Sequence, residues 1–443
     1  MKPKFLFLFP EGWDEVAFAT VAAYRDEFEV VCEGFNLFEF PQNANILWFD
    51  ARRWIEKLKR KYRRAGLVGV ASTSEQYGAL LAASLAQEFG LPGTDPAAIV
   101  RAQHKYYARQ ALAAELPEAT PEFCLLPYEF RRTAVVADNP GLAYPFFVKP
   151  VKAAFSVLAR RVDSPAELQE HLTFHPWESH IIKRLVVPFR DLMHLHTDFT
   201  IDPQHMMSEA LLTGVQINVD GWMHRGNIGF LGIVDAIMYP GTSAFQRFEY
   251  PSRLPADAQA RACTVAERAM RALGFDHGLF NVELFWKPDD GTFKIIEVNP
   301  RLAAQFGDLY EKVDGTSPYL LLADLSVGRE PRWTRRAGRY GAAASFVFRE
   351  FNGVVKIAPA KADIRWLNAT YPDAYLETFI KHGNSRWRET KWLGSYRYAI
   401  VNLGGADRDD LHRRFDDICR HLAFEQPGTV RFSPGIDALR QGR

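Results

Sequence analysis

The stretch His277–Arg301, HGLFNVELFWKPDDGTFKIIEVNPR, constrains the fold of this chain more than any other. Apolar and polar residues alternate on both sides of a central KPDDG, whose proline and glycine supply turn chemistry. The pattern predicts a β-hairpin. Because successive side chains of a strand point to opposite faces, one face of the hairpin should pack on a core through Val282, Leu284, Trp286, Ile296 and Val298.

The opposite face of the predicted hairpin carries Glu283, Glu297 and Asn299. With the turn centred near Asp290, the two glutamates lie opposite each other. Their carboxylates repel by about 4 kcal/mol at contact distance when the effective dielectric constant is about 20. A hard cation such as Mg²⁺, which prefers oxygen ligands, would offset this repulsion. Arg301 follows Asn299 by two residues and can face an anion held by the metal. The alternative is that both glutamates lie on a solvated strand face.

An acidic residue on one strand, followed by E-x-N-x-R at the end of the next, resembles the metal-binding hairpin of the ATP-grasp superfamily. The resemblance implies an ATP-grasp domain over residues 99–330, preceded by a Rossmann-like α/β domain over 1–98 and followed by a small α+β domain over 331–443. The implied fold class is α/β plus α+β. ATP and Mg²⁺ (or Mn²⁺) are the implied cofactors, with the metal bound by Glu283, Glu297 and Asn299.

Two lysines resemble the ATP-grasp pair that contacts the nucleotide phosphates: Lys105 on a predicted helix, and Lys149 at the end of the apolar strand YPFFVKP. The alternative for Lys149 is a surface lysine whose stem lies along apolar surface. The loop that follows, VKAAFSVLARRV at 151–162, contains no glycine. In the superfamily this loop is glycine-rich, so that backbone N–H groups can approach phosphates closely. Ser156 would donate its hydroxyl there instead.

The segment 206–221, MMSEALLTGVQINVDG, resembles the strand, hinge and strand that hold adenine and ribose in ATP-grasp proteins. Gln216 falls where the family usually has a ribose-binding glutamate, and an amide still hydrogen-bonds hydroxyl groups, less strongly because it is uncharged. A purely structural hairpin would look much the same. By the resemblance, the adenine is lined by Ser208, Glu209, Ala210 and Leu211.

The segment 242–254, TSAFQRFEYPSRL, supplies two further candidates, Arg247 and Glu249. In superfamily ligases a loop at this place faces the acyl substrate and the metals, so the resemblance makes both residues catalytic candidates together with Arg301. Surface ion pairing explains Arg247 and Glu249 equally well.

The remaining elements are expected as follows. Strand and helix signals alternate up to about residue 98, which predicts a small parallel sheet with covering helices. A strand is expected at 179–187, followed by His194 and His196, which are interpreted as structural because a third ligand at suitable spacing is missing. Near the carboxyl end we expect a hairpin over 342–349 and 354–357, a strand at 396–402 and an amphipathic helix at 407–424.

Composition narrows the possible partners. The formal net charge is only +1, which removes the long-range field typical of nucleic-acid binders. The four cysteines are far apart in sequence and indicate reduced thiols. No apolar run is long enough to span a membrane. We therefore expect a cytoplasmic protein with no nucleic-acid or membrane partner, and an apolar amino-terminal domain that could support a homodimer.

The resemblance implies an ATP-dependent ligase. Such an enzyme converts a carboxylate into an acyl phosphate, which an amine then attacks, so the partners would be a small-molecule carboxylate and amine of amino-acid or peptide-like chemistry. Two alternatives remain open from the sequence. One is a non-catalytic, ATP-binding regulatory protein with the same fold, which the glycine-free loop and Gln216 favour. The other is a carboxylase-type enzyme, disfavoured because the chain contains no biotin-carrier segment.

Overall fold

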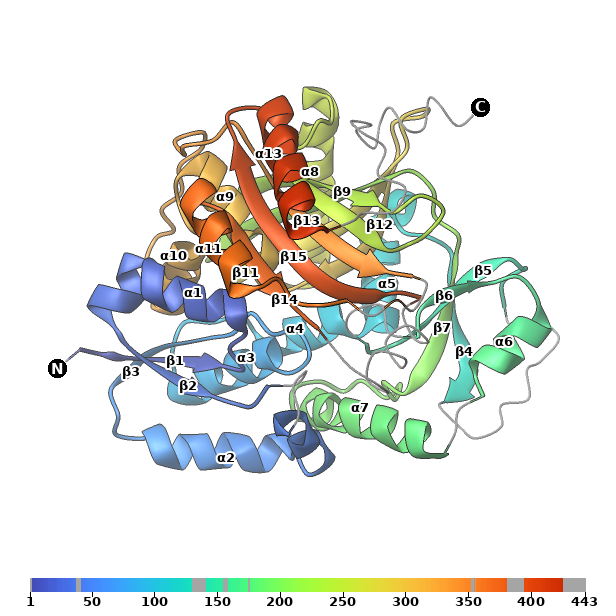
Figure 1. Ribbon diagram of the computed structural model, residues 1–443. Coiled ribbons are helices and arrows are strands. Elements are labelled where there is room, and N and C mark those ends of the chain that lie inside the picture. Colours follow the sequence, from blue (N-terminus) through green and yellow to red (C-terminus); the bar gives the residue numbers. More distant parts are fainter. Residues whose placement is uncertain are drawn as a thin grey trace.

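The computed structural model describes residues 2–36, 41–129, 141–153, 158–173, 176–351, 354, 356–380 and 394–424 (Figure 1). In these ranges the strands form three sheets, one of three strands, one of eight and one of four. The three sheets surround a group of charged residues contributed by each of them, which is described below.

The amino-terminal region contains the small parallel sheet that the sequence predicts, with strand order β2-β1-β3. Residues Phe5–Leu8 of the central strand are fully buried because helices cover both faces of the sheet. The strands are β1 (Lys4–Leu8), β2 (Glu29–Glu33) and β3 (Leu67–Ala71). The covering elements are α1 (Gly12–Thr20), η1 (Ala23–Glu27), η2 (Gln42–Leu47), α2 (Ala51–Tyr62) and α3 (Gly78–Phe89).

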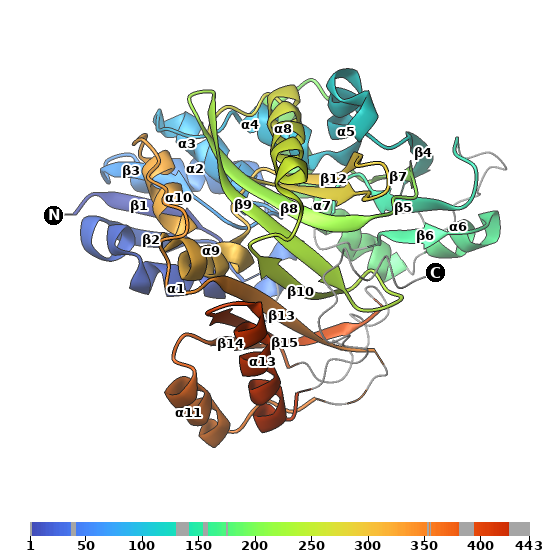
Figure 2. The ribbon, with the colours of Figure 1, turned by 90° about the horizontal axis from the view of Figure 1, so that it is seen from above.

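The eight-stranded sheet is the centre of the molecule, with strand order β12-β11-β8-β9-β10-β13-β15-β14. Its strands are β8 (Val215–His224), β9 (Asn227–Met238), β10 (Phe245–Tyr250), β11 (Gly278–Trp286), β12 (Phe293–Asn299), β13 (Ala342–Glu350), β14 (Tyr375–Thr378) and β15 (Tyr396–Gly405). On one face α8 (Ala256–Ala272) packs on β8, β9 and β12, and α13 (Arg408–Leu422) packs on β13 and β15 (Figure 2). The other face meets η4 (Ala304–Phe306), α9 (Gly307–Asp314), α10 (Pro318–Ser326) and the amino-terminal sheet.

The carboxyl-terminal strands do not form a sheet of their own, in contrast to the separate module expected from the sequence. β13 pairs antiparallel with β10, with Tyr250 opposite Ala343, and so extends the central sheet. The reason lies in the sequence AAASFVF, which is apolar on both faces and suits an interior strand. The expected strand at 354–357 is not formed at its described residues, whereas α11 (Lys361–Thr370), β15 and α13 follow.

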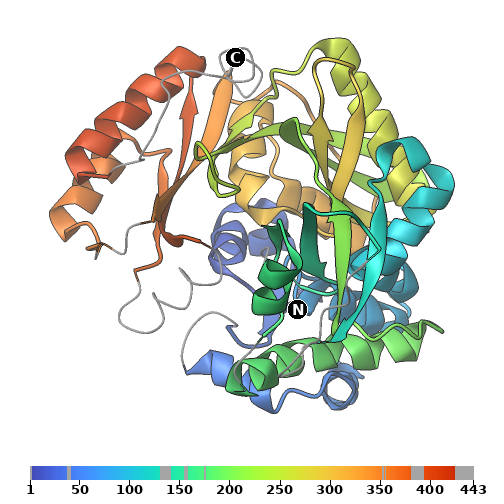
Figure 3. The same cartoon turned by 90° about the vertical axis from the view of Figure 1, so that its right-hand side faces the viewer.

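The four-stranded sheet has the order β4-β7-β5-β6 and lies away from the carboxyl-terminal helices, as Figure 3 shows. Its strands are β4 (Phe123–Glu129), β5 (Phe146–Pro150), β6 (Arg160–Val162) and β7 (His205–Ala210). The helices α4 (Pro96–Gln103) and α5 (Lys105–Glu115) and the turn η3 (Pro117–Ala119) connect the amino-terminal region to this sheet. The helices α6 (Pro165–His171) and α7 (Pro176–His196) connect β6 to β7.

The prediction of a strand at 179–187 is wrong, because this segment belongs to the helix α7. The run HIIKRLVV has adjacent apolar residues that fit a strand, but the buried positions Ile182, Val186, Phe189 and Met193 recur at helical spacing. The helix ends at His196, whose Nε2 lies 2.9 Å from Ser84 Oγ. The interpretation of this histidine as a structural residue therefore agrees with its contact.

Candidate active site

The predicted hairpin is formed by β11 and β12 in the predicted register. Glu283 lies opposite Glu297, and Asn281 lies opposite Asn299. A β-bulge follows, because the next pair is Leu284 with Ile295, so that Ile296 is the extra residue.

This bulge corrects one detail of the core prediction. Ile295, at 0% exposure, takes the buried place that the sequence assigned to Ile296. The bulged residue instead presents its carbonyl oxygen to Arg109, whose Nη2 donates to Ile296 O at 2.6 Å.

The polar face of the hairpin is a hydrogen-bonded network around Glu283. Asn299 Nδ2 donates to Glu283 Oε1 at 3.2 Å, and Gln216 Nε2 donates to Glu283 Oε2 at 3.0 Å. Asn299 Nδ2 also donates to Asn281 Oδ1 at 3.0 Å. Burial, together with the neighbouring negative charge of Glu297, raises the pKa of Glu283 to about 7. Ionisation of Glu283 is therefore disfavoured while Glu297 beside it is charged.

The donor chemistry of this face fits a hard divalent cation. Two carboxylates face each other, and the Asn299 amide uses its nitrogen within the protein, which leaves its oxygen for a ligand. Within the described residues, no cluster of three or more His, Cys, Asp or Glu side chains is arranged to hold a metal. A metal at Glu283, Glu297 and Asn299 would therefore need water or phosphate oxygens to complete its shell, which is typical of Mg²⁺.

Two buried nitrogen atoms support the presence of a ligand at this face. Asn218 lies next to Glu283 in the register of β8 and β11, and its Nδ2 atom has no hydrogen-bond partner among the described residues. The Nε atom of Arg301 is also buried and has no hydrogen-bond partner among the described residues. Buried donors are normally satisfied, so an unsatisfied pair here indicates an absent acceptor.

Both predicted phosphate-binding lysines lie at this site. Lys105, the first residue of α5, donates to Ala153 O at 2.9 Å and forms an ion pair with Glu297. Lys149 Nζ lies 2.8 Å from Glu209 Oε2. Burial lowers the pKa of Lys149 to about 8. Ser156 lies outside the described residues.

Glu209 has a different environment from the one expected. Its carboxylate faces inward, where Arg109 Nε donates to Oε1 at 2.7 Å and Arg109 Nη2 donates to Oε2 at 3.2 Å. Burial alone would raise the pKa of Glu209, but Arg109 and Lys149 lower it to about 2. The side chain thus binds two cations and is not directed at a base, while the backbone of Glu209 lies between the paired strands β4 and β5.

The other residues expected to line the adenine lie at the carboxyl end of β7. Ser208 is fully buried, and its hydroxyl donates to Cys124 O at 3.5 Å. Ala210 N donates to Glu122 O at 2.9 Å, and Leu211 follows the strand in a half-buried position. Gln216 is on the polar face of the hairpin, as its bond to Glu283 shows.

Arg301 is held by a residue that the sequence did not single out. Its Nη2 lies 2.6 Å from Glu75 Oε2, and Glu75 belongs to the loop between β3 and α3 of the amino-terminal region. Burial opposes the charged guanidinium, but Glu75 raises the pKa of Arg301. The amino-terminal region therefore contributes a charged group to the site.

Arg247 and Glu249 lie on the other face of the central sheet. Glu283 pairs with Asn218, which pairs with Val234 of β9, so these residues share a face. Glu249 pairs with Asp235, the next residue along β9, and alternation places it on the opposite face.

The same ion pair is also enclosed by α13. Arg247 Nε lies 2.7 Å from Glu249 Oε1, and His412 Nε2 lies 3.1 Å from the same oxygen. Both members of the pair are buried, so they form neither the expected surface pair nor a part of the Glu283 cluster. The structure supports a packing role for them.

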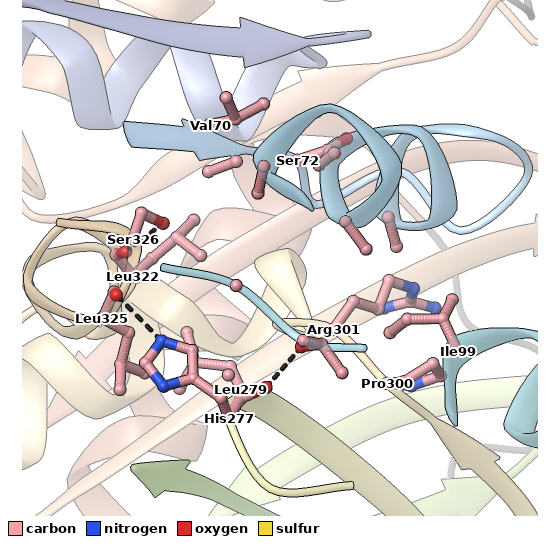
Figure 4. Close-up of a pocket in the computed structure, with 18 of the residues that line it drawn as sticks. Val70, Ser72, Ile99, His277, Leu279, Pro300, Arg301, Leu322, Leu325 and Ser326 are labelled. Atoms are coloured by element: carbon pink, nitrogen blue, oxygen red, sulfur yellow. Dashed lines mark hydrogen bonds between the residues drawn. The ribbon is translucent and has the colours of Figure 1, made fainter. Parts of the chain in front are cut away.

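A cavity of about 70 Å³ lies behind the site, between β3, α3 and α10 (Figure 4). Its walls are mainly apolar, formed by alanines of α3 and by Val70, Ile99, Leu279 and Leu322. His277 borders it, with Nε2 2.9 Å from Leu325 O. Among the described residues that line it, Arg301 is the only charged one, so the cavity offers mainly apolar contacts.

Comparison with known proteins identifies one family model and distant relatives. Residues 142–308 match the model of the ATP-grasp domain. Uncharacterized protein y4rH of Sinorhizobium fredii (strain NBRC 101917 / NGR234) is 28% identical over 309 residues, a match that covers 66% of this chain and 56% of that protein. The chain therefore spans little more than half the length of this curated relative.

Solved structures share the fold over nearly the whole chain. An L-amino acid ligase from Bacillus licheniformis has a TM-score of 0.70 at 16% identity and covers 95% of this chain and 98% of its own. N5-carboxyaminoimidazole synthase from Aspergillus clavatus, solved in complex with ADP, has a TM-score of 0.64 at 14% identity. The match covers 95% of this chain and 99% of that protein's chain. Within the described ranges, no helix has both the length and the apolar character needed to cross a membrane.

Proposed function

Because residues 142–308 match the ATP-grasp domain, we propose that this chain is an ATP-dependent ligase that joins a carboxylate to an amine. One observation carries the proposal: the half-buried carboxylates of Glu283 and Glu297 face each other across the hairpin, and Lys105, Lys149 and Arg301 surround them. Such a mixture of opposite charges suits a metal–triphosphate complex, in which a cation and an anion arrive together.

In this proposal the nucleotide is ATP and the metal is Mg²⁺ or Mn²⁺. Glu283, Glu297 and Asn299 would hold the metal, which neutralises phosphate charge when it is bound. Lys105 and Lys149 would contact phosphate oxygens, and Gln216 and the backbone near Ser208–Leu211 would contact the nucleoside. The carboxylate of Glu297 forms an ion pair with Lys105.

The proposed reaction has two steps. A carboxylate oxygen of the substrate attacks the γ-phosphorus of ATP, and the bond from that phosphorus to the bridging oxygen breaks, with its electron pair leaving on ADP. An amine then attacks the acyl carbon, inorganic phosphate leaves with the bonding pair, and the nitrogen loses one proton to solvent. The protein contributes positioning and fixed positive charge, which are the main requirements of phosphoryl transfer.

The substrate class is proposed to be amino acids or small peptides. The similarity in fold to an L-amino acid ligase supports this class. Arg301 is proposed to bind either the transferred phosphoryl group or a substrate carboxylate, because its guanidinium lies at the site and already pairs with one carboxylate, that of Glu75.

A second candidate is an ATP-binding regulatory protein without catalysis. The glycine-free loop at 151–162 and the presence of Gln216 in place of a glutamate favour it. The complete set of Glu283, Glu297, Asn299 and Arg301 favours the ligase, because a protein that only binds nucleotide needs no group directed at an acceptor.

Release of ADP and phosphate by the purified protein tests the proposal. We expect release from Mg²⁺-ATP when one carboxylate and one amine from a panel of amino acids, dipeptides and small carboxylates are supplied together, and little release with either alone. Tight binding of ATP with no release under any pairing would contradict the ligase and support the regulatory protein.

A further inference from the structure

Lys152 is a buried cation of the site that the proposed mechanism has not used. It follows Lys149 by three residues, directly after β5, and its side chain is only 2% exposed. Its Nζ donates to Gln103 Oε1 at 3.2 Å and lies 4.9 Å from the centre of the Phe189 ring. Gln103 is itself fixed, because its Nε2 donates to Glu75 O at 3.1 Å.

Lys152 differs from the other cations of the site in having no anionic partner. Lys105 pairs with Glu297, Lys149 with Glu209, and Arg301 with Glu75. Among the described residues, no carboxylate lies within ion-pairing distance of the Lys152 ammonium. An amide oxygen and an aromatic ring compensate a buried charge incompletely, and burying it without a counter-ion is costly. Consistent with this, burial lowers the pKa of Lys152 to about 8.

Hydrogen bonds place Lys152 toward Arg301. Lys152 donates to Gln103, which donates to the backbone of Glu75, and the Glu75 carboxylate pairs with Arg301. By contrast, Lys149 pairs with Glu209 near the carboxyl end of β7, and the same carboxylate pairs with Arg109 of α5.

Lys105 lies between these two environments. On one side its Nζ donates to Ala153 O, the residue next to Lys152. On the other side it pairs with Glu297, which follows Ile296, and the carbonyl of Ile296 accepts from Arg109. The three lysines therefore form a row from the proposed nucleoside end, at Lys149, through Lys105 to Lys152 beside Arg301. An extended triphosphate laid along this row from its nucleoside has its terminal phosphoryl group nearest to Lys152.

We propose that Lys152 binds the γ-phosphoryl group of ATP and then the same group in the acyl phosphate. The inference rests on the proposed ligase function. In the superfamily, backbone N–H groups of a glycine-rich loop bind phosphate at this place in the chain. The loop 151–162 contains no glycine, and the Lys152 ammonium would bind the phosphate instead. Lys152 forms no covalent bond in this scheme and acts only through its charge.

Nucleotide binding to the full chain tests this assignment without a substrate. Calorimetric titrations with Mg²⁺ and either ADP or β,γ-imido-ATP would compare the wild type with Lys152→Met and Lys152→Arg. We expect Lys152→Met to weaken binding of the ATP analogue by roughly 10- to 100-fold, the size of a lost hydrogen bond between charged groups, and to leave ADP binding nearly unchanged. Lys152→Arg should retain most of the preference for the triphosphate.

Two further variants serve as controls. Lys183→Met removes a charge from an exposed position of α7, the helix that carries Phe189, and should leave both affinities unchanged. If circular dichroism shows that Lys152→Met does not fold, Lys152→Gln, which keeps a hydrogen-bond donor beside Gln103, is measured in the same way.

The outcomes are distinguishable. If the wild type binds the ATP analogue and the loss of Lys152 weakens both nucleotides equally, or neither, the assignment of Lys152 is overturned and the proposed function stands. Normal binding of both nucleotides with a raised KM for the carboxylate substrate would place Lys152 at that substrate and also overturn the assignment. If the wild type binds neither nucleotide, the proposed function fails and the assignment of Lys152 fails with it.

Discussion

Single residues of the site divide into those visible in the sequence and those that only the fold brings together. Glu283, Glu297 and Asn299 follow from strand alternation around one turn, and their register is confirmed. Asn281 was missed, although it lies two residues before Glu283 and therefore on the same face. Glu75 lies more than 200 positions away from its partner Arg301, and no local pattern indicates such a contact.

Two glutamates on opposite faces of the sheet, the half-buried Glu297 and the buried Glu249, give a matched test at the residue scale. Glu297→Gln removes a proposed metal ligand, and we expect turnover to fall by at least about 100-fold, as for other losses of charge stabilisation in an active site. Glu249→Gln removes a carboxylate that pairs with Arg247 and His412, so it should lower the melting temperature and keep most of the turnover per folded molecule.

Steady-state ADP release, normalised to the folded fraction, measures both variants. Full activity of Glu297→Gln would contradict the metal site. A folded Glu249→Gln protein without turnover would return Glu249 to the catalytic candidates.

At the scale of elements, the main errors of prediction arose where one pattern fits two structures. The segment 179–187 has neighbouring apolar residues that are compatible with the period of a strand and with that of a helix. In the structure it is part of the helix α7. Arg247 and Glu249 were assigned to the site by their place in the chain. Which face of a sheet a residue occupies depends on strand order and register, and these are set by contacts distant in sequence.

Arg109 joins three elements, because it lies on α5, pairs with Glu209 of β7 and donates to the bulged carbonyl of Ile296 in β12. We expect Arg109→Met to reduce the free energy of unfolding by about 3–5 kcal/mol, since it leaves a buried carboxylate with one cation fewer. The exposed pair of Arg268 with Glu118 is the control, and Arg268→Met should cost less than about 1 kcal/mol. Denaturant unfolding measures both variants.

The pH dependence of these unfolding curves adds a sign that can be checked. The pKa of Glu209 is about 2 in the folded chain, compared with the ordinary value of 4.5 that applies to the unfolded chain. Its stabilisation is therefore fully present above pH 4.5 and is lost as the pH falls toward 2. The difference in stability between wild type and Arg109→Met should shrink over that range. A difference that stays constant would show that Arg109 acts through packing alone.

At the scale of the whole molecule, the site exists only because distant parts of the chain converge. The amino-terminal region contributes Glu75, the four-stranded sheet contributes Lys149 and Glu209, and the hairpin contributes Glu283, Glu297 and Arg301. The small parallel sheet at the amino terminus was predictable from alternating strand and helix signals. The continuity of β10 with β13 was not, because a strand's neighbour is chosen by tertiary packing.

The transfer of labelled oxygen tests the central claim most directly. A carboxylate substrate that supports ADP release is prepared with ¹⁸O in its carboxyl group, and the inorganic phosphate formed with its amine partner is examined by mass spectrometry. Because the carboxylate oxygen that attacks the γ-phosphorus leaves with the phosphate, the proposed mechanism predicts one ¹⁸O atom in each phosphate released. Formation of the amide product with unlabelled phosphate would contradict an acyl phosphate, and with it the proposed ligase mechanism.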